Sequence, residues 1–379
     1  MAQRVTHAFG APRALANTAT LLAMHEERLS VFARARIPVA RRLLRAVLGT
    51  AALRDRLAKS RQGSVQGRTL DPDVAAMLRL DDLEQASVLR GYSPGRARLR
   101  LAEQIPIVDG PPPGGVTTRD HRFPGPACEL WLRAYAPEGA TGTLPAIVYI
   151  HGGGFVTCSV ATHDGLCRRL ALGARAKVLS LDYRLAPEHP YPAAVEDGLA
   201  GFRWVIDNAA TLGIDPQHVA VAGDSAGGNL SAVIARRTRN DATPPALAAL
   251  FYPATDATCS LPSHRSLGDR YFLTRDNVAW YYDHYAPPEV DRRQPDLSPL
   301  FADDLAGICR TLVYVCGFDP LLDEGVAYAQ KLKAAGGAVE LHELSDQIHG
   351  FLLMSEVPSS RSATAQVAER IGEALRTGR

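Results

Sequence analysis

The sequence has few of the features that mark disulfide-stabilised, membrane-spanning or nucleic-acid-binding proteins. Six cysteines in 379 residues, none in a Cys-x-x-Cys pair, are too sparse for a disulfide scaffold and predict reduced thiols in a cytoplasmic protein. No apolar run approaches the ~18–20 residues of a membrane span, and residues 14–24 are too polar for a signal-peptide core. The net charge is only +2, which gives no overall argument for a nucleic-acid partner.

Charge is nevertheless uneven along the chain. Residues 1–61 carry a net charge of +9, so the remainder carries −7. A helical pattern in this basic segment places Leu43, Leu44, Val47 and Leu48 on one broad face, which predicts packing against another element. We expect the opposite, basic face to be solvated. Weak association with an anionic lipid surface is the alternative.

From residue 116 onward, strand and helix patterns alternate. Apolar or alternating runs predict strands at 129–135, 145–150, 177–183, 218–222, 246–253, 311–316 and 338–344. Helical patterns lie at 161–174, 194–210, directly after Ser225, at 321–335 and in a last segment with Val367, Ile371 and Leu375 in register. This alternation predicts an α/β fold with a mostly parallel sheet covered on both faces.

One serine stands where a strand becomes a helix. The run Val219 to Ala222 leads directly into Gly223-Asp224-Ser225-Ala226-Gly227. A side chain on such a turn projects above the sheet, and the turn is so tight that the residues two before and two after must be small. The following helix directs its amino terminus at the serine, where it favours negative charge and where the Ala226 N–H can donate to an oxyanion.

A serine nucleophile needs a base, an acid that orients the base, and further oxyanion donors. His349 follows the strand at 338–344, and Asp319 follows the strand at 311–316. The chain order Ser, Asp, His is that of an α/β-hydrolase. The glycines of "HGGGF" (151–155) free the N–H groups of Gly153 and Gly154 to face a bound oxygen.

Five ordered motifs resemble those of the bacterial hormone-sensitive-lipase-like esterases, α/β-hydrolases of lipolytic family IV. The motifs are HGGGF (151–155), DYRLAPEHPYPAA (182–194), GDSAGG (223–228), FDPLLDEG (318–325) and HGF (349–351). The resemblance covers roughly residues 70–355. It implies Ser225 as nucleophile, Asp319 as acid and His349 as base, with Gly153, Gly154 and Ala226 as oxyanion donors. It also implies carboxylesterase activity on short- to medium-chain esters, without a cofactor.

The same resemblance implies a helical cap over the site. Its expected parts are residues 1–100, of which 1–61 form a basic extension, and an insert at 256–298. The catalytic domain is expected at 101–255 and 299–379. Because both are cap elements, the apolar face of 1–61 is predicted to pack against the insert at 271–285. One or two of the insert's aromatic residues are expected to face the ligand, namely among Phe272, Trp280, Tyr281, Tyr282 and Tyr285.

Other interpretations of these residues are open to test. HGGGF could cradle phosphate, but no Lys-Ser/Thr follows it as in a P-loop. His342, Glu343 and His349 could suggest a metal site, but the first two alternate on a strand and no HExxH spacing exists. We therefore expect no metal.

Four further polar residues of the motifs receive structural roles. Asp323 and Glu324 rival Asp319 as the acid, but they lie on the following helix and are expected to support it. Asp224 and His151 are expected to organise their loops through hydrogen bonds.

Two further functions fit the same motifs. An amidase or deacetylase could use the same triad, and a non-catalytic small-ligand binding protein could use the same fold. A binding protein is expected to lose the base, whereas His349 is present. The sequence therefore favours a small ester substrate, and it predicts no nucleic-acid partner.

Overall fold

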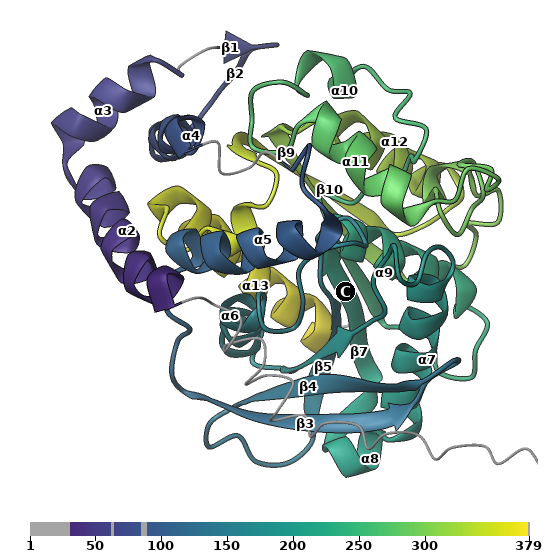
Figure 1. Cartoon of the computed structure of the whole chain (residues 1–379). Helices are drawn as coiled ribbons and strands as arrows, with labels where there is room; N and C mark the ends of the chain where they lie inside the picture. Colours follow the sequence, from purple (N-terminus) through teal and green to yellow (C-terminus); the bar gives the residue numbers. More distant parts are fainter. Residues whose placement is uncertain (1–30, 62–63, 85–88, 378–379) are drawn as a thin grey trace, which may run out of the picture.

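The computed structural model describes residues 31–61, 64–84 and 89–377, and its centre is one eight-stranded sheet (Figure 1). The strand order is β10-β9-β8-β7-β5-β6-β4-β3. Neighbours from β10 to β6 are parallel, whereas β4 is antiparallel to both β6 and β3. The bounds are β3 Val116–Pro124, β4 Glu129–Pro137, β5 Leu144–Ile150, β6 Lys177–Asp182, β7 Ile214–Asp224, β8 Leu247–Phe251, β9 Arg310–Phe318 and β10 Val339–Ile348. The predicted α/β-hydrolase architecture is confirmed.

Helices cover both faces of the sheet. One layer contains α6 (Asp164–Ala174) and α13 (Pro358–Thr377), and the other contains α7 (Ala193–Asp207), α9 (Ala226–Arg237) and α12 (Leu322–Ala334). Side chains of β5 alternate between two cores, because Ile147 belongs to the α6/α13 side and Val148 to the α7/α9 side. Burial on both faces explains why these strands are continuous apolar runs.

Short elements complete the described chain. They are the helices α8 (Ala209–Leu212) and α10 (Ser263–Ser266), the 3-10 helices η1 (Pro299–Phe301) and η2 (Phe351–Leu353), and the small hairpin β1 (Ser64–Val65) and β2 (Arg68–Thr69). Among the described residues, no helix is both long enough and apolar enough to cross a bilayer.

Within residues 31–61, 64–84 and 89–115, four helices precede the sheet: α2 (Val31–Gly49), α3 (Ala51–Lys59), α4 (Pro72–Glu84) and α5 (Pro94–Asp109). The side chain of Asp71 caps the start of α4, since its Oδ1 accepts from the N–H of Asp73 at 2.9 Å and of Val74 at 3.1 Å. Residues 1–30, which the sequence analysis included in the basic segment, lie outside the described residues.

The apolar face of α2 is narrower than predicted. Leu44 and Leu48 are buried, but Leu43 is 63% exposed, so its assignment to the buried face was wrong. Adjacent helical residues point about 100° apart, so Leu43 turns outward while Leu44 packs inward and Val47 is half-buried.

The predicted partner of α2 was also wrong. The helix packs on α5 and α4, far from the insert helix α11 (Arg275–Tyr285) in Figure 1. Two arginines fasten it there: Arg41 Nε donates to the carbonyl oxygen of Pro106 at 3.1 Å, and Arg45 pairs with Glu356 at 2.6 Å. The basic segment reaches the insert at its far end, where Arg61 donates to the Arg270 carbonyl at 2.8 Å.

The insert and the N-terminal helices meet over the edge of the sheet where the parallel strands end. Thr274 caps α11 by accepting from the Asn277 N–H at 3.2 Å. The Asn277 side-chain oxygen in turn accepts from the Leu89 N–H at 3.2 Å. Segments almost 190 residues apart in the chain are thereby joined above the carboxyl edge of the sheet, where α/β proteins place their ligands.

Candidate functional site

Ser225 lies on a strained turn between β7 and α9. Its φ is +56°, a region that non-glycine residues rarely adopt. The turn is held because the Ser225 N–H donates to Phe251 at 2.9 Å and its carbonyl accepts from the Asn229 N–H at 3.0 Å. A Cβ on Gly223 would collide with the Gly227 carbonyl, and one on Gly227 would collide with that of Ile150. Only glycine fits at these two positions.

The structure brings the three predicted polar side chains together. His349 Nε2 lies 3.0 Å from Ser225 Oγ, and His349 Nδ1 lies 2.8 Å from Asp319 Oδ2. Asp319 is fully buried, and its second oxygen accepts from the Leu321 N–H at 2.9 Å. A carboxylate on Nδ1 selects the tautomer whose Nε2 can accept the serine proton. The arrangement can therefore deprotonate a serine as it attacks an electrophile.

The glycine loop after β5 lies beside this serine. Gly153 and Gly154 have φ values of +106° and +59°, which explains the need for glycine. The Gly153 carbonyl accepts from Thr157 Oγ1 at 2.9 Å, which turns it away into the loop. Gly153, Gly154 and Ala226, the first residue of α9, line the same cavity as Ser225.

Asp224 fastens the glycine loop to the serine turn. Its Oδ1 accepts from the Gly152 N–H at 2.9 Å and from the Tyr149 hydroxyl at 2.7 Å. Burial opposes its charge, but His163, 3.3 Å away, and these hydrogen bonds outweigh burial and hold the pKa of Asp224 below its ordinary value. The loop-organising role predicted for Asp224 agrees with these contacts.

His151 also holds the loop. Its Nδ1–H donates to the Gly152 carbonyl at 2.8 Å, and its ring stacks on Tyr183 with 4.4 Å between centroids. Burial and the neighbouring His163 lower the pKa of His151 to about 3, so the ring is neutral at ordinary pH. So weak a base is poorly suited to accept a proton from a reacting group, which leaves the hydrogen bond and the ring stacking as the contributions of His151.

A cavity of about 130 Å³ opens above Ser225 and His349. Three of the five candidate aromatic residues line it, where one or two were predicted: Phe272, Tyr281 and Tyr282. The ring of Tyr285 is instead buried in a stack on Phe155, 3.9 Å between centroids.

Helix α5 supplies a wall of this cavity that the sequence analysis missed. Leu101, Ile105 and Val108 face it. Their i, i+4, i+7 spacing is an amphipathic signal, although Pro106 within the same helix weakens it.

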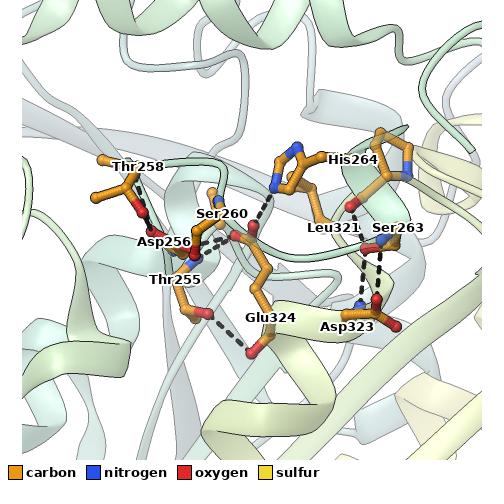
Figure 2. A network of polar contacts seen from close by, with 12 residues as sticks. Thr255, Asp256, Thr258, Ser260, Ser263, His264, Leu321, Asp323 and Glu324 are labelled. Carbon is orange, nitrogen blue, oxygen red and sulfur yellow. Dashed lines mark hydrogen bonds and ion pairs between the residues drawn. The ribbon is translucent and has the colours of Figure 1, made fainter. Parts of the chain in front are cut away.

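The rival acids point elsewhere. Asp323 Oδ2 accepts from the Ser263 N–H at 2.8 Å, and Glu324 Oε2 lies 2.6 Å from His264 Nε2 (Figure 2).

The residues of the alternative metal site have other partners. His342 stacks on Tyr314 with 4.7 Å between ring centroids, whereas Glu343 pairs with Arg68. Within the part of the chain that the structure describes, no three His, Cys, Asp or Glu side chains form a group that could hold a metal ion.

Comparison with known proteins places these residues in a family. A family model described as the alpha/beta hydrolase fold matches residues 147–353. The carboxylic ester hydrolase LipN of Mycobacterium tuberculosis is 41% identical over 81% of this chain and 83% of its own length. The ethyl acetate hydrolase of Pseudomonas putida is 34% identical over 76% of this chain and 94% of its own.

A solved structure agrees over nearly the same span. An ester hydrolase from the metagenome of Lake Arreo, in complex with a bipyridine phosphonate derivative, has a TM-score of 0.77 and 38% identity. The match covers 81% of this chain and 100% of that one. With its serine turn, glycine loop and eight-stranded sheet, the chain belongs to the hormone-sensitive-lipase-like carboxylesterases of the α/β-hydrolase superfamily.

Proposed function

We propose that the protein is a serine carboxylesterase that hydrolyses small, uncharged esters of short to medium acyl chain. The observation that carries the proposal is the contact chain from Ser225 Oγ through His349 to Asp319, at 3.0 Å and 2.8 Å, opening on an apolar cavity. In this proposal Ser225 is the nucleophile, His349 the general base and Asp319 the acid that orients it.

The reaction proceeds in two balanced halves. His349 Nε2 takes the proton of Ser225 as Oγ bonds to the ester carbonyl carbon, and the resulting oxyanion lies against the N–H groups of Gly153, Gly154 and Ala226. The His349 imidazolium then protonates the leaving alcohol oxygen, which departs and leaves an acyl-serine. Water, deprotonated by His349, attacks the acyl carbon, and Ser225 leaves with the returned proton.

The cavity supports the proposed substrate class. Its walls are mostly aliphatic and aromatic side chains from α5, the insert and the segment after His349. Such walls favour uncharged acyl chains, because a charged group would lose its hydration without gaining a partner. The preference for short chains is carried over from relatives such as the ethyl acetate hydrolase of Pseudomonas putida.

We also propose that the N-terminal helices and the insert at 256–298 form a cap on the catalytic domain. Support comes from the cavity, which Leu89, α5, Phe272 and Tyr281 line together. Because α5 is one helix through Asp109, the cap boundary is better placed at 109 than at 100.

A cytoplasmic location and a solvated outer face for α2 and α3 complete the proposal. All six cysteines lie in described residues and none is paired, which is compatible with a reducing compartment.

The test is a burst experiment on an activated nitrophenyl ester. Stoichiometric release of nitrophenol should precede steady turnover, and a serine-reactive phosphonate should label Ser225 and abolish it. Absence of both burst and label would favour a binding protein instead. Comparison with the matching anilide separates the esterase from an amidase, since equal kcat/KM values for ester and anilide would contradict the proposal.

A further inference from the structure

A second buried polar cluster, shown in Figure 2, takes no part in the chemistry above. Its central residue, Glu324, lies five residues after Asp319. Glu324, in the first turn of α12, is fully buried, and His264, in α10 of the insert, is 2% exposed. Glu324 Oε2 lies 2.6 Å from His264 Nε2. Glu324 Oε1 accepts from the N–H groups of Thr255 at 2.6 Å and Asp256 at 3.2 Å. A carboxylate buried so deeply needs such partners to remain charged.

One side of this cluster is attached to the serine turn. Thr255 and Asp256 directly follow Ala254, whose N–H donates to the Ser225 carbonyl at 3.2 Å. The Ala254 carbonyl accepts from the side-chain amide of Asn229, one turn into α9, at 2.6 Å. Glu324 therefore binds Thr255 and Asp256, which directly follow the residue that is hydrogen-bonded to the serine turn.

The other side is attached to the loop of the acid. Glu324 lies five residues after Asp319, and between them the Leu321 N–H donates to Asp319 Oδ1 at 2.9 Å. The insert grips the same loop, because Ser263 Oγ donates to the Pro320 carbonyl at 2.6 Å and Ser263 N–H to Asp323 at 2.8 Å. The cluster thus joins three segments: the chain after the nucleophile turn, the acid loop and the insert.

We propose that Glu324 and His264 are positioning residues for ester hydrolysis, which hold residues 254–256 against the acid loop at the spacing that lets Asp319, His349 and Ser225 contact one another. The proposal rests on the function proposed above, because it assigns consequences to those three contacts. Catalytic groups must be held to within a fraction of an ångström, and a displacement of about 1 Å can cost roughly 10²-fold in rate.

The chemistry of the pair suits this role. Burial lowers the pKa of His264, but the hydrogen bond and charge of Glu324 outweigh burial and leave that pKa above its ordinary value. The Nε2–H of His264 donates to Oε2, which leaves Oε1 free to accept from the two backbone N–H groups. Within the described part of the chain, the buried Nδ1 of His264 has no hydrogen-bond partner, so the hydrogen bonding of the ring there is to Glu324 alone.

The location of the pair separates its effect on rate from any effect on substrate binding. Neither Glu324 nor His264 lines the cavity above Ser225. Loss of the pair should therefore lower kcat and leave KM nearly unchanged, whereas a residue that contacts substrate would alter both.

The experiment measures kcat and KM per phosphonate-titrated active site, well below the unfolding temperature of each variant. Glu324→Ala should lower kcat by roughly 10²-fold with KM within about threefold of wild type. Glu324→Gln keeps an oxygen for the N–H groups of Thr255 and Asp256, so it should restore kcat to within about threefold of wild type. His264→Ala leaves the carboxylate unpaired and should lower kcat by about tenfold.

Arg236→Met is the matched control. Arg236 is also buried and forms ion pairs with Asp296 and Asp304, but it lies at the end of α9 remote from Ser225. Its replacement should lower the unfolding temperature and leave kcat per site unchanged. If Glu324→Ala does not fold, Ser263→Ala substitutes for it, because loss of its hydroxyl frees the Pro320 carbonyl and should lower kcat several-fold at constant KM.

Equal kcat per site in wild type, His264→Ala and either Glu324→Ala or Ser263→Ala would overturn the proposal, even if all variants melted earlier. If Glu324→Gln lowered kcat as much as Glu324→Ala, the hydrogen bonds from the N–H groups of Thr255 and Asp256 to Glu324 would not be what positions the site. Failure of the esterase assignment looks different, since wild type itself would then show no burst and no label on Ser225.

Discussion

Two histidine–carboxylate pairs take their carboxylates, Asp319 and Glu324, from the segment that follows the same strand, β9, and they differ in what surrounds them. Asp319 lies 2.8 Å from His349, and Glu324 lies 2.6 Å from His264. The second nitrogen of His349 faces Ser225 Oγ and the cavity, whereas that of His264 is buried and has no hydrogen-bond partner among the residues that the structure describes. The first pair can therefore pass a proton to a reacting oxygen. The second can only hold its neighbours in place.

Residue type and the distance within the pair therefore do not distinguish a proton relay from a structural pair. Both pairs are short, buried and made of the same groups. The difference lies in access, because only a nitrogen that faces an ionisable nucleophile and a substrate cavity can exchange protons with a substrate.

Removal of the nucleophile should have the largest effect on activity, and it should affect only the function of the Asp319–His349 pair. Ser225→Ala should lower kcat/KM for an activated ester by roughly 10⁴–10⁶-fold, because the first pair loses the oxygen it acts on. The second pair remains, so thermal unfolding should shift by no more than a few degrees. Turnover and calorimetry on one preparation check both statements. Retained hydrolysis, with phosphonate label elsewhere, would contradict the assignment.

Replacing the carboxylate by its amide in each pair tests whether the two pairs differ in function. Asp319→Asn should lower kcat by roughly 10⁴-fold, because an amide stabilises the wrong tautomer of His349. Glu324→Gln should stay within about threefold of wild type, and Asp323→Asn should be similarly mild. Steady-state kinetics on purified variants decide the order. A larger loss in either helix variant than in Asp319→Asn would mean that the acid has been misassigned.

A third buried histidine, His151, contacts a carbonyl instead of a carboxylate and should respond to acid differently. Burial lowers its pKa to about 3 from an ordinary 6.5, so the unfolded chain binds a proton that the folded protein excludes. The free energy of unfolding should therefore lose nothing through His151 above about pH 6.5, and it should fall as the pH decreases below that value. The expected loss from His151 is about 2 kcal/mol by pH 5.

Urea unfolding at pH 7 and pH 5 measures this loss, and His151→Gln should remove it. Asp109 and Asp182, whose pKa values burial raises to about 6, act in the opposite direction but are common to both proteins. The difference between wild type and variant isolates His151. An identical pH dependence in the two proteins would show that the ring is not held neutral.

Deletion of residues 1–61 should have the smallest effect, because it touches neither pair. The deletion uncovers the surface of α5 on which α2 packs, and other residues of α5 line the cavity. Turnover of an acetate ester should change by less than about threefold, and that of long or bulky esters should change more. The exposed surface of α5 should also increase aggregation, measured by light scattering.

Arg45→Ala, which breaks only the ion pair to Glu356, is the milder control for that deletion. If deletion instead abolished salt-sensitive binding to anionic vesicles and left the profile across ester sizes unchanged, the segment would be a membrane-surface anchor and not a support for α5.

Local chemistry made much of the site predictable. Gly223 and Gly227 could be recognised because their places in the turn leave no room for a Cβ. Asp319 and His349 could be recognised because each follows a predicted strand, and parallel strands end at one edge of the sheet. These inferences need only the strand pattern and the order of elements.

Packing partners were not predictable in the same way. The pattern on α2 was recognised, but its partner α5 was not, and Leu43 was placed on the wrong face. An apolar stripe indicates that a surface will be buried, but it carries no information about which other stripe will cover it. The walls of the cavity from α5 were missed for the same reason.

The α/β alternation, the tight turn at Ser225, the glycine loop and the chain order of the polar residues could be inferred from the amino-acid sequence, because each depends on neighbours within a few positions. The folded chain was needed to show that Tyr281 lines the cavity, that α2 rests on α5, and that His264 meets Glu324 sixty residues away. Those contacts depend on how the insert and the N-terminal helices settle on the sheet, and many side chains act together in that packing.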